Sequence, residues 1–245
     1  MKKILSALAI TALAACSTIP DYRALAAHTV PSNVELIGDF TNPYTGEEVK
    51  NRTFCSGVQL TQTDILTAGH CVNSADVRFD KKIKIRLANG KVYLATVVKS
   101  VMVDGDNIGA LKARDSALLR IDVPELPNPA VIGDSTALKQ GDMVAIVGNT
   151  LGELVDNFVV TYIGHTNRKL DCCGVFIQTG PGAAGGNSGG GVYNMKGELI
   201  GLLTRGADGV ASLVVPIERV MMELEEANGD TTFEKLKKKF QFRWK

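Results

Sequence analysis

The sequence has almost no excess of charge of either sign. Its 245 residues include 27 lysines and arginines against 26 aspartates and glutamates, a formal net charge of +1. A chain with so balanced a charge has no overall field that attracts nucleic acid or another polyanion. We therefore expect no nucleic-acid partner.

The sequence is also poor in residues spaced to bind a metal ion. It has only three histidines, His28, His70 and His165, and these are scattered along the chain. None of its five cysteines forms a Cys-x-x-Cys pair. Structural metal sites are recognised by closely spaced Cys and His residues. We therefore expect no metal.

Prolines are few and glycines frequent, 8 against 25, which favours turns over long helices. Short apolar or alternating runs follow one another along the chain, and this pattern predicts an all-β fold, either a sandwich or barrels. The expected strands are residues 55–60, 83–87, 92–98, 117–121, 143–147, 158–163, 175–178, 199–203 and 212–215.

One cluster of prolines, at residues 124–129, divides this strand-bearing region and is the best candidate for a linker. We expect a first β-domain over residues 33–123 and a second over 130–215. After Pro216 the pattern changes to Ile217, Val220, Met221 and Leu224 with acids between them, which predicts a C-terminal helix over 216–228.

The N-terminus has the features of an export signal. Two lysines precede an uncharged, mostly apolar stretch, residues 4–15, that is too short to span a bilayer. The segment Leu13-Ala14-Ala15-Cys16 resembles the lipobox of bacterial lipoproteins, in which the cysteine is diacylated and becomes the mature N-terminus. The alternative is a plain secretory signal followed by a chance cysteine.

The lipoprotein interpretation places the protein in the bacterial cell envelope, held to a membrane by Cys16. We expect residues 16–32 to be a tether, because they show no periodic pattern. Ser17 resembles the residue found in lipoproteins sorted to the outer membrane of diderm bacteria. The tail, residues 229–245, mixes basic and aromatic residues and could bind a membrane surface or pack back on the protein body.

An exported protein folds in an oxidising environment, so the four remaining cysteines predict at least one disulfide. A bridge between Cys55 and Cys71 would close a short loop and stabilise the fold by roughly 3 kcal/mol. Cys172 and Cys173 are adjacent in the chain, and free thiols, a strained bridge and an intermolecular bond all remain open for them.

The chemistry of the sequence is concentrated in Gly186-Asn187-Ser188-Gly189-Gly190. A serine becomes a nucleophile when a histidine takes its proton, an acid orients the histidine and backbone N–H groups receive the oxyanion. The pentapeptide fits the nucleophile elbow of α/β-hydrolases, but those enzymes need a histidine after the serine, and none follows Ser188. The order His70, Asp115, Ser188 is instead that of chymotrypsin-like enzymes.

Five segments carry a specific family resemblance. Leu66-Thr67-Ala68-Gly69-His70-Cys71 resembles the segment with the catalytic histidine in trypsin-like proteases, and Cys55 matches the usual disulfide partner of Cys71. Residues 114–119, Arg-Asp-Ser-Ala-Leu-Leu, resemble the family's catalytic-acid motif. Residues 176–179, 186–190 and 197–201 are similar to the second barrel of bacterial HtrA-type serine proteases. The resemblance covers residues 50–220.

The resemblance implies two antiparallel six-stranded β-barrels with a C-terminal helix, and a serine endopeptidase that needs no cofactor and acts on proteins or peptides. It implies a triad of His70, Asp115 and Ser188, with the N–H groups of Gly186 and Ser188 as oxyanion hole. Asn187 replaces the acid that trypsin uses in zymogen activation, so that switch is absent. The alternative is a catalytically silent lipoprotein that keeps the protease fold to bind envelope proteins or peptides.

The resemblance also predicts the specificity pocket. Gly182 stands where an enzyme that cuts after Lys or Arg has an acid, and Thr204 and Gly206 should form the opposite wall. This lining predicts cleavage after small or medium uncharged residues. Asp208 would restore a preference for basic residues if the alignment were shifted by one position.

Overall fold

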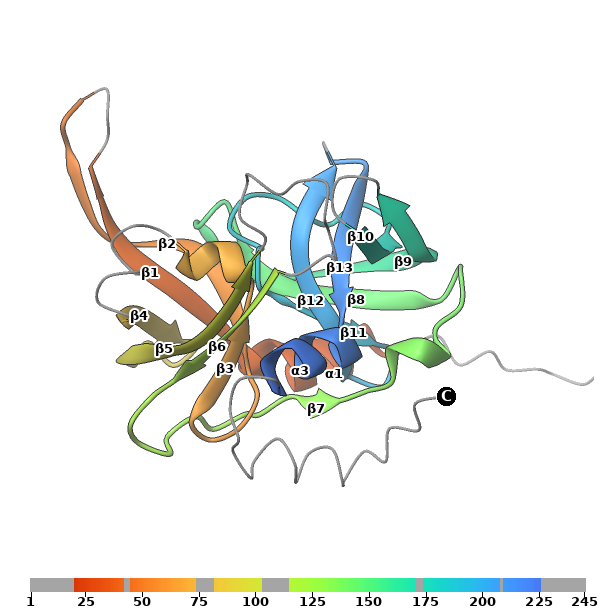
Figure 1. Ribbon diagram of the computed structural model, residues 1–245, viewed down its shortest axis with the longest axis horizontal. Coiled ribbons are helices and arrows are strands. Elements are labelled where there is room, and N and C mark those ends of the chain that lie inside the picture. The colour runs from red at the N-terminus through yellow and green to blue at the C-terminus, as the bar shows by residue number, and fades with distance from the viewer. Residues whose placement is uncertain are drawn as a thin grey trace, which may run out of the picture.

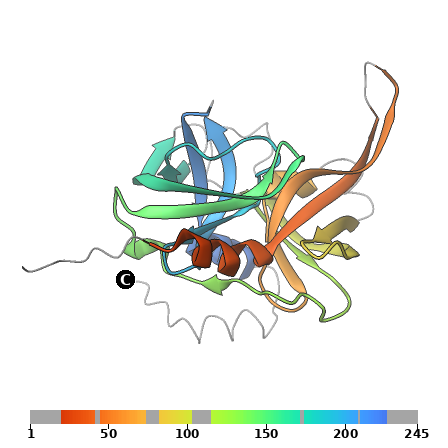
Figure 2. The ribbon, with the colours of Figure 1, turned by 180° about the vertical axis from the view of Figure 1, so that it is seen from behind.

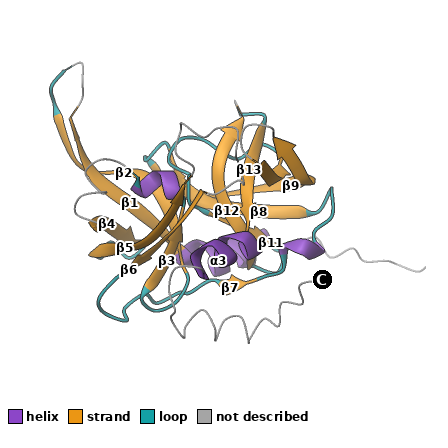
Figure 3. Ribbon diagram, in the orientation of Figure 1, coloured by secondary structure: helices purple, strands orange, loops and turns teal. Residues whose placement is uncertain are grey.

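The fold is seen in a computed structural model that describes residues 20–41, 45–73, 82–102, 115–170, 174–207 and 209–225. Strands make up most of these residues, as Figure 3 shows. The predicted all-β class is thereby confirmed. Several predicted features lie outside the described residues: the signal segment 1–15, Cys16, Cys172, Cys173, Asp208 and the tail 229–245.

The first of two β-bodies is a closed antiparallel barrel with the strand order β1-β2-β3-β6-β5-β4 (Figure 1). Its strands are β1 (Asn33–Thr41), β2 (Glu48–Gln59), β3 (Asp64–Thr67), β4 (Lys82–Leu87), β5 (Val92–Met102) and β6 (Asp115–Arg120). In β4, Ile83 and Ile85 are buried while Lys82 and Lys84 are exposed. Successive side chains of a β-strand point to opposite faces, so this alternation of isoleucine and lysine fits a strand with one face toward the barrel interior and the other toward solvent.

The second body is a seven-stranded sheet with the order β11-β8-β9-β10-β13-β12-β7. Its strands are β7 (Val131–Ile132), β8 (Met143–Thr150), β9 (Leu154–Leu170), β10 (Gly174–Thr179), β11 (Gly191–Asn194), β12 (Glu198–Ala207) and β13 (Ala211–Pro216). Pairing of β11 with β12 closes six strands into an antiparallel ring, and β7 adds to β12 in parallel. The expectation of two six-stranded barrels is confirmed.

Apolar side chains form three clusters. One fills the first barrel around Leu36, Ile85 and Leu119, and one fills the second around Ile146 and Ile200. The third lies between the bodies, because it joins Leu66 and Leu118 of the first barrel to Phe176, Leu202 and Val215 of the second. The bodies therefore share a core as well as a linker.

The expected tether is wrong for residues 22–32. These form α1 (Tyr22–Thr29) and the 3-10 turn η1 (Val30–Ser32), and Leu25 and Thr29 are buried. The helix begins at a cap, since the Asp21 carboxylate accepts from the N–H groups of Arg23 and Ala24 at 3.0 and 3.1 Å. Figure 2 shows α1 at the foot of the second body.

The C-terminal helix is α3 (Ile217–Glu225), which begins directly after β13. Ile217, Val220 and Leu224 are fully buried in the cluster between the bodies, and α3 contacts β5 and β6 of the first barrel as well as β12 and β13 of the second. An amphipathic helix thus packs against both bodies. Among the described helices, none has the length and apolar character needed to cross a membrane.

Candidate active site

His70 and Asp115 lie at one edge of the first barrel. Strand β3 pairs with β6, with Thr67 opposite Ala117, so the residues just after β3 lie beside the start of β6. A 3-10 turn, η2 (Gly69–Val72), follows β3 and carries His70, while Asp115 is the first residue of β6. Gly69 permits this turn, because a Cβ there would lie 2.6 Å from the carbonyl oxygen of Val101.

Asp115 accepts two hydrogen bonds from His70. Its Oδ1 accepts from the backbone N–H of His70 at 2.9 Å, and its Oδ2 lies 2.8 Å from His70 Nδ1. The Asp115 side chain is 8% exposed and that of His70 is 39% exposed. Because an ionised carboxylate only accepts, Nδ1 carries the proton, and Nε2 has a lone pair available to take one.

Ser188 lies in the loop between β10 and β11, and the first barrel holds this loop directly. The carbonyl oxygen of Ser188 accepts from Ser56 N at 2.8 Å and lies 3.6 Å from the Sγ of Cys71, the residue after His70. Gly189, with φ +84°, allows this approach, because a Cβ there would lie 2.3 Å from the carbonyl oxygen of Ser56. The loop is therefore fixed beside His70.

Two N–H groups among residues 186–190 have no acceptor among the described residues. These are Gly186 N and Ser188 N, whereas the N–H groups of residues 187, 189 and 190 donate to backbone carbonyls. Gly186 has φ +88°, and a Cβ there would lie 2.2 Å from the carbonyl oxygen of Asn149. Only glycine fits there, and N–H groups without an acceptor at residues 186 and 188 suit a developing oxyanion.

Asn187 is almost fully buried, with 2% exposure, and its amide is satisfied inside the second body. Its Nδ2 donates to the carbonyl oxygen of Gly182 at 3.1 Å, and its Oδ1 accepts from Thr150 Oγ1 at 2.9 Å. The amide thus fixes the loop that contains Ser188 without a charged partner.

A polar network at the boundary of the two bodies supports the same loop. Ser56 Oγ donates to the carbonyl oxygen of Gly186 and accepts from Asn149 N, both at 2.8 Å. Asn33 Nδ2 donates to Asn149 Oδ1 at 2.8 Å and to Asp156 Oδ1 at 2.7 Å. Burial raises the pKa of the Asp156 carboxyl, and the hydrogen bond from Asn33 opposes this rise. Hydrogen bonds therefore cross between the bodies at the site.

His70 and Ser188 line one cleft of about 1240 Å³, together with Phe54 and Leu94 of the first barrel. A smaller hollow of about 300 Å³ adjoins it and is lined by Phe54, Leu151 and Gly186 among others. A peptide laid across Ser188 could therefore contact apolar side chains of the first barrel.

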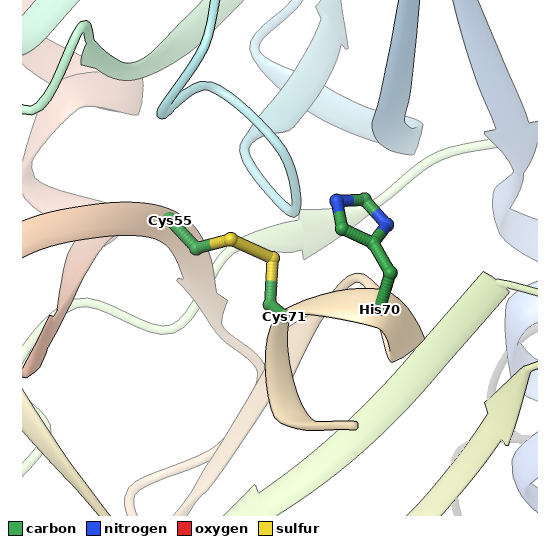
Figure 4. A group of neighbouring side chains, drawn as sticks. All are labelled: Cys55, His70 and Cys71. Carbon is green, nitrogen blue, oxygen red and sulfur yellow. A yellow bond between two sulfur atoms is a disulfide. The ribbon is translucent and has the colours of Figure 1, made fainter. Parts of the chain in front are cut away.

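Cys55 and Cys71 form a disulfide beside His70 (Figure 4). Their sulfur atoms and the imidazole lie within 4.8 Å of one another. A disulfide sulfur is not a thiolate, so this group does not have the donor set of a metal site while the bridge is intact. The bridge instead joins β2 to the turn that carries His70.

The residues expected to form the specificity pocket are close to Ser188. The carbonyl oxygen of Gly182 is bonded to Asn187, and Leu203, next to Thr204, accepts from Gly189 N at 2.7 Å. A Cβ built on Gly206 would lie 3.2 Å from the Cβ of Ala183. The segments around Gly182 and Gly206 therefore face one another across a narrow space.

The model of the family described as "Trypsin-like peptidase domain" matches residues 55–202, which include His70, Asp115 and Ser188. This match covers more than half of the chain. The chain belongs to the trypsin-like peptidase family. The matched region begins at the disulfide cysteine Cys55 and ends in β12, so it includes strands of both bodies.

Curated relatives of this chain include proteins whose names place them in the periplasm. It is 32% identical over 65% of its length to the periplasmic serine endoprotease DegP of Salmonella typhimurium, and covers 31% of that protein. It is 34% identical over 57% of its length to the periplasmic pH-dependent serine endoprotease DegQ of Escherichia coli, covering 28%. The chain thus spans about a third of the length of these relatives.

Sequence reasoning did not single out three residues that hold the peptidase site, Ser56, Asn149 and Thr150. Each bonds to the loop that contains Ser188 or to another residue of this support. Ser56 follows Cys55 in the sequence, and this is a usable signal, because a residue next to a cysteine bridged to the histidine turn must lie near the site. Nothing in the local sequence marks Asn149 or Thr150.

Proposed function

We propose that this peptidase is a serine endopeptidase whose nucleophile is Ser188. His70 takes the serine proton as general base and returns it to the leaving amine, while Asp115 orients the imidazole and stabilises its charged form. The N–H groups of Gly186 and Ser188 receive the oxyanion. The observation that carries this proposal is the pair of hydrogen bonds from His70 to Asp115 beside a cleft that Ser188 also lines.

The test is hydrolysis of a denatured protein. The purified mature chain should fragment casein, and the Ser188→Ala variant, prepared in parallel, should not. Equal fragmentation by both proteins would show a contaminating protease or another nucleophile, and intact casein with both would reject the proposed function. No added metal or cofactor should be required.

We propose cleavage after small or medium uncharged residues. The support is the absence of an acid at Gly182, the short separation between Ala183 and a Cβ built on Gly206, and the engagement of the Thr204 hydroxyl with the carbonyl oxygen of Leu213 at 3.4 Å. A pocket of this kind discriminates by burial and steric exclusion, which is worth roughly 1 to 3 kcal/mol per methylene.

Replacing Gly206 with valine should narrow the pocket further. We expect kcat/KM for cleavage after leucine to fall by about a hundredfold, while cleavage after alanine falls by less than about tenfold, because only the larger side chain would clash. The measurement is the ratio of kcat/KM for matched peptides that differ only in that residue. An unchanged ratio, or dominant cleavage after Lys or Arg that Asp208→Ala abolishes, would contradict the proposed pocket.

We also propose that the peptidase works in the cell envelope on protein or peptide substrates, anchored by a diacylated Cys16 with or without help from residues 229–245. The periplasmic names of its relatives support export, and the lipobox-like segment supports the anchor. Two acyl chains are enough for stable attachment to a membrane.

A Cys16→Ser variant should move from the membrane fraction to the soluble fraction, because it cannot be acylated. The measurement is fractionation of cells followed by immunoblotting, with a Ser17→Ala variant as the matched control that keeps the lipid. If the Cys16→Ser variant stays in the membrane fraction even after residues 229–245 are deleted, the anchoring proposal is wrong.

A further inference from the structure

A buried carboxylate on the C-terminal helix is hydrogen-bonded to the residue next to Asp115. The side chain of Ser116, which is fully buried, donates to Glu223 Oε2 at 2.9 Å, and Glu223 itself is only 4% exposed. A carboxylate is costly to bury, so such a position is normally occupied only when the charge is held by partners. The contact joins α3 to the first residues of β6.

Ser116 is in contact with both sides of the His70–Asp115 pair. It follows Asp115 in β6, and its main chain lies against Gly69, the residue before His70. A Cβ built on Gly69 would lie 3.2 Å from both the nitrogen and the oxygen of Ser116. A shift of Ser116 would therefore move the carboxylate and the histidine turn relative to each other.

The helix that carries Glu223 is also bonded to the second body. Arg219, one helical turn earlier, donates from Nη1 to the carbonyl oxygen of Val175 in β10. Burial lowers the pKa of the Arg219 guanidinium from its ordinary value, and the Glu223 carboxylate opposes this shift, as expected for charges on neighbouring turns of a helix. Helix α3 is thus bonded to β10 through Arg219 and to β6 through Glu223.

We propose that Glu223 is a positioning residue that aligns Asp115 with His70 by fixing Ser116, an inference that rests on the proposed function. The carboxylate does not touch substrate. It restrains the end of β6 where Asp115 lies. The alignment of Asp115 with His70 therefore depends on the packing of α3 between the two bodies. Packing of Val220 and Leu224 fixes the position of the helix. The hydrogen bond from Ser116 to Glu223 then fixes the start of β6 relative to that helix.

The helix provides a matched control in Glu218. This residue is also buried on α3 and also holds a serine, because Glu218 Oε1 accepts from Ser135 N at 2.8 Å and Oε2 accepts from the Ser135 hydroxyl. Ser135 lies in the turn η4 (Ser135–Ala137) of the second body, not beside Asp115. Loss of either glutamate should therefore affect stability, but only loss of Glu223 should affect the alignment of Asp115.

The experiment measures kcat and KM of the full mature chain for a peptide substrate, at a temperature where circular dichroism shows each variant to be folded. Glu223→Leu and Ser116→Ala should lower kcat by roughly tenfold or more with KM unchanged, because a small misplacement of a catalytic group is costly. Glu223→Gln keeps an acceptor for Ser116 and should restore most of the rate. Glu218→Leu and Ser135→Ala should leave kcat unchanged.

A proton NMR measurement separates this inference from the proposed function. The Nδ1 proton of His70, bonded to Asp115, should give a downfield signal that shifts or broadens in Glu223→Leu and returns in Glu223→Gln, whether or not the protein hydrolyses a substrate. An unchanged signal and an unchanged kcat in Glu223→Leu would overturn the inference. Equal effects of Glu218→Leu and Glu223→Leu would also overturn it, because they would indicate a general loss of helix packing.

Discussion

Replacement of Ser188 by alanine should lower kcat by about a million-fold, to the residual rate that binding and the oxyanion donors alone support. A substrate carbonyl would lie between His70 and the N–H groups of Gly186 and Ser188. The Ser188 hydroxyl is the only nucleophilic group of the loop that could attack it there. The fold should not change, because the contacts that fix the loop use backbone atoms of Ser188 and not its hydroxyl. The measurement is steady-state hydrolysis of a chromogenic peptide.

The His70→Ala variant gives a sharper form of this prediction. Serine and histidine act as one unit, so the double variant Ser188→Ala/His70→Ala should be no slower than either single variant. Losses that multiply in the double variant would show that the two side chains act independently. That result would contradict a serine nucleophile activated by His70.

Replacement of Asp115 by asparagine should lower kcat by about ten-thousand-fold while leaving the fold intact. Oδ1 of Asp115 accepts from the backbone N–H of His70, so the amide oxygen of asparagine must take that position. The amide NH₂ then faces Nδ1, which can only accept from it. The proton of the imidazole moves to Nε2, and His70 can no longer take a proton from Ser188.

Asp64→Asn is the matched control for this effect. Asp64 is a buried carboxylate of the same barrel, and it pairs with Arg120 at 2.6 Å, away from His70. Its replacement should lower thermal stability but leave kcat of the folded protein unchanged. Equal losses of kcat in both variants would mean that Asp115 has only a structural role.

The sequence was a good guide to the strands that carry strongly apolar runs. The nine expected strands match β2, β4, β5, β6, β8, β9, β10, β12 and β13, and only the ranges 55–60 and 117–121 extend beyond the observed strand, each by one residue. Strand β1 was not expected, because Glu35, Gly38 and Asp39 interrupt its apolar residues. Glu35 is tolerated there because Arg86 of the neighbouring strand pairs with it at 2.6 Å, and this partner is known only once the two strands are side by side.

Helix α1 was missed for a different reason. It is short and rich in alanine, with a single large buried apolar residue, Leu25, so it has little of the periodicity by which helices are recognised. Asp21 was a usable cap signal, but a cap without an apolar stripe is weak evidence for a helix. Its burial depends on the second body, which the local sequence does not describe.

The candidate site was predictable to the extent that short motifs fix its chemistry. The segments around His70, Asp115 and Ser188 are each continuous in sequence, and the structure brings His70 and Asp115 into direct contact. The residues that hold these segments in place are not continuous in sequence. The bonded pairs are far apart in the chain, and only the packing of the β-strands and α3 brings them together: Ser56 with Asn149, and Ser116 with Glu223.

The central claim is that Ser188 is a nucleophile activated by His70, and covalent labelling with a fluorophosphonate tests it most directly. The serine oxygen would attack phosphorus, fluoride would leave, and His70 would take the serine proton, so a stable phosphonyl group would remain on the protein. We predict one adduct per folded molecule, mapped by mass spectrometry to Ser188 and absent from Ser188→Ala and His70→Ala. Equal labelling of the wild type and Ser188→Ala, or an adduct on another residue, would contradict the account.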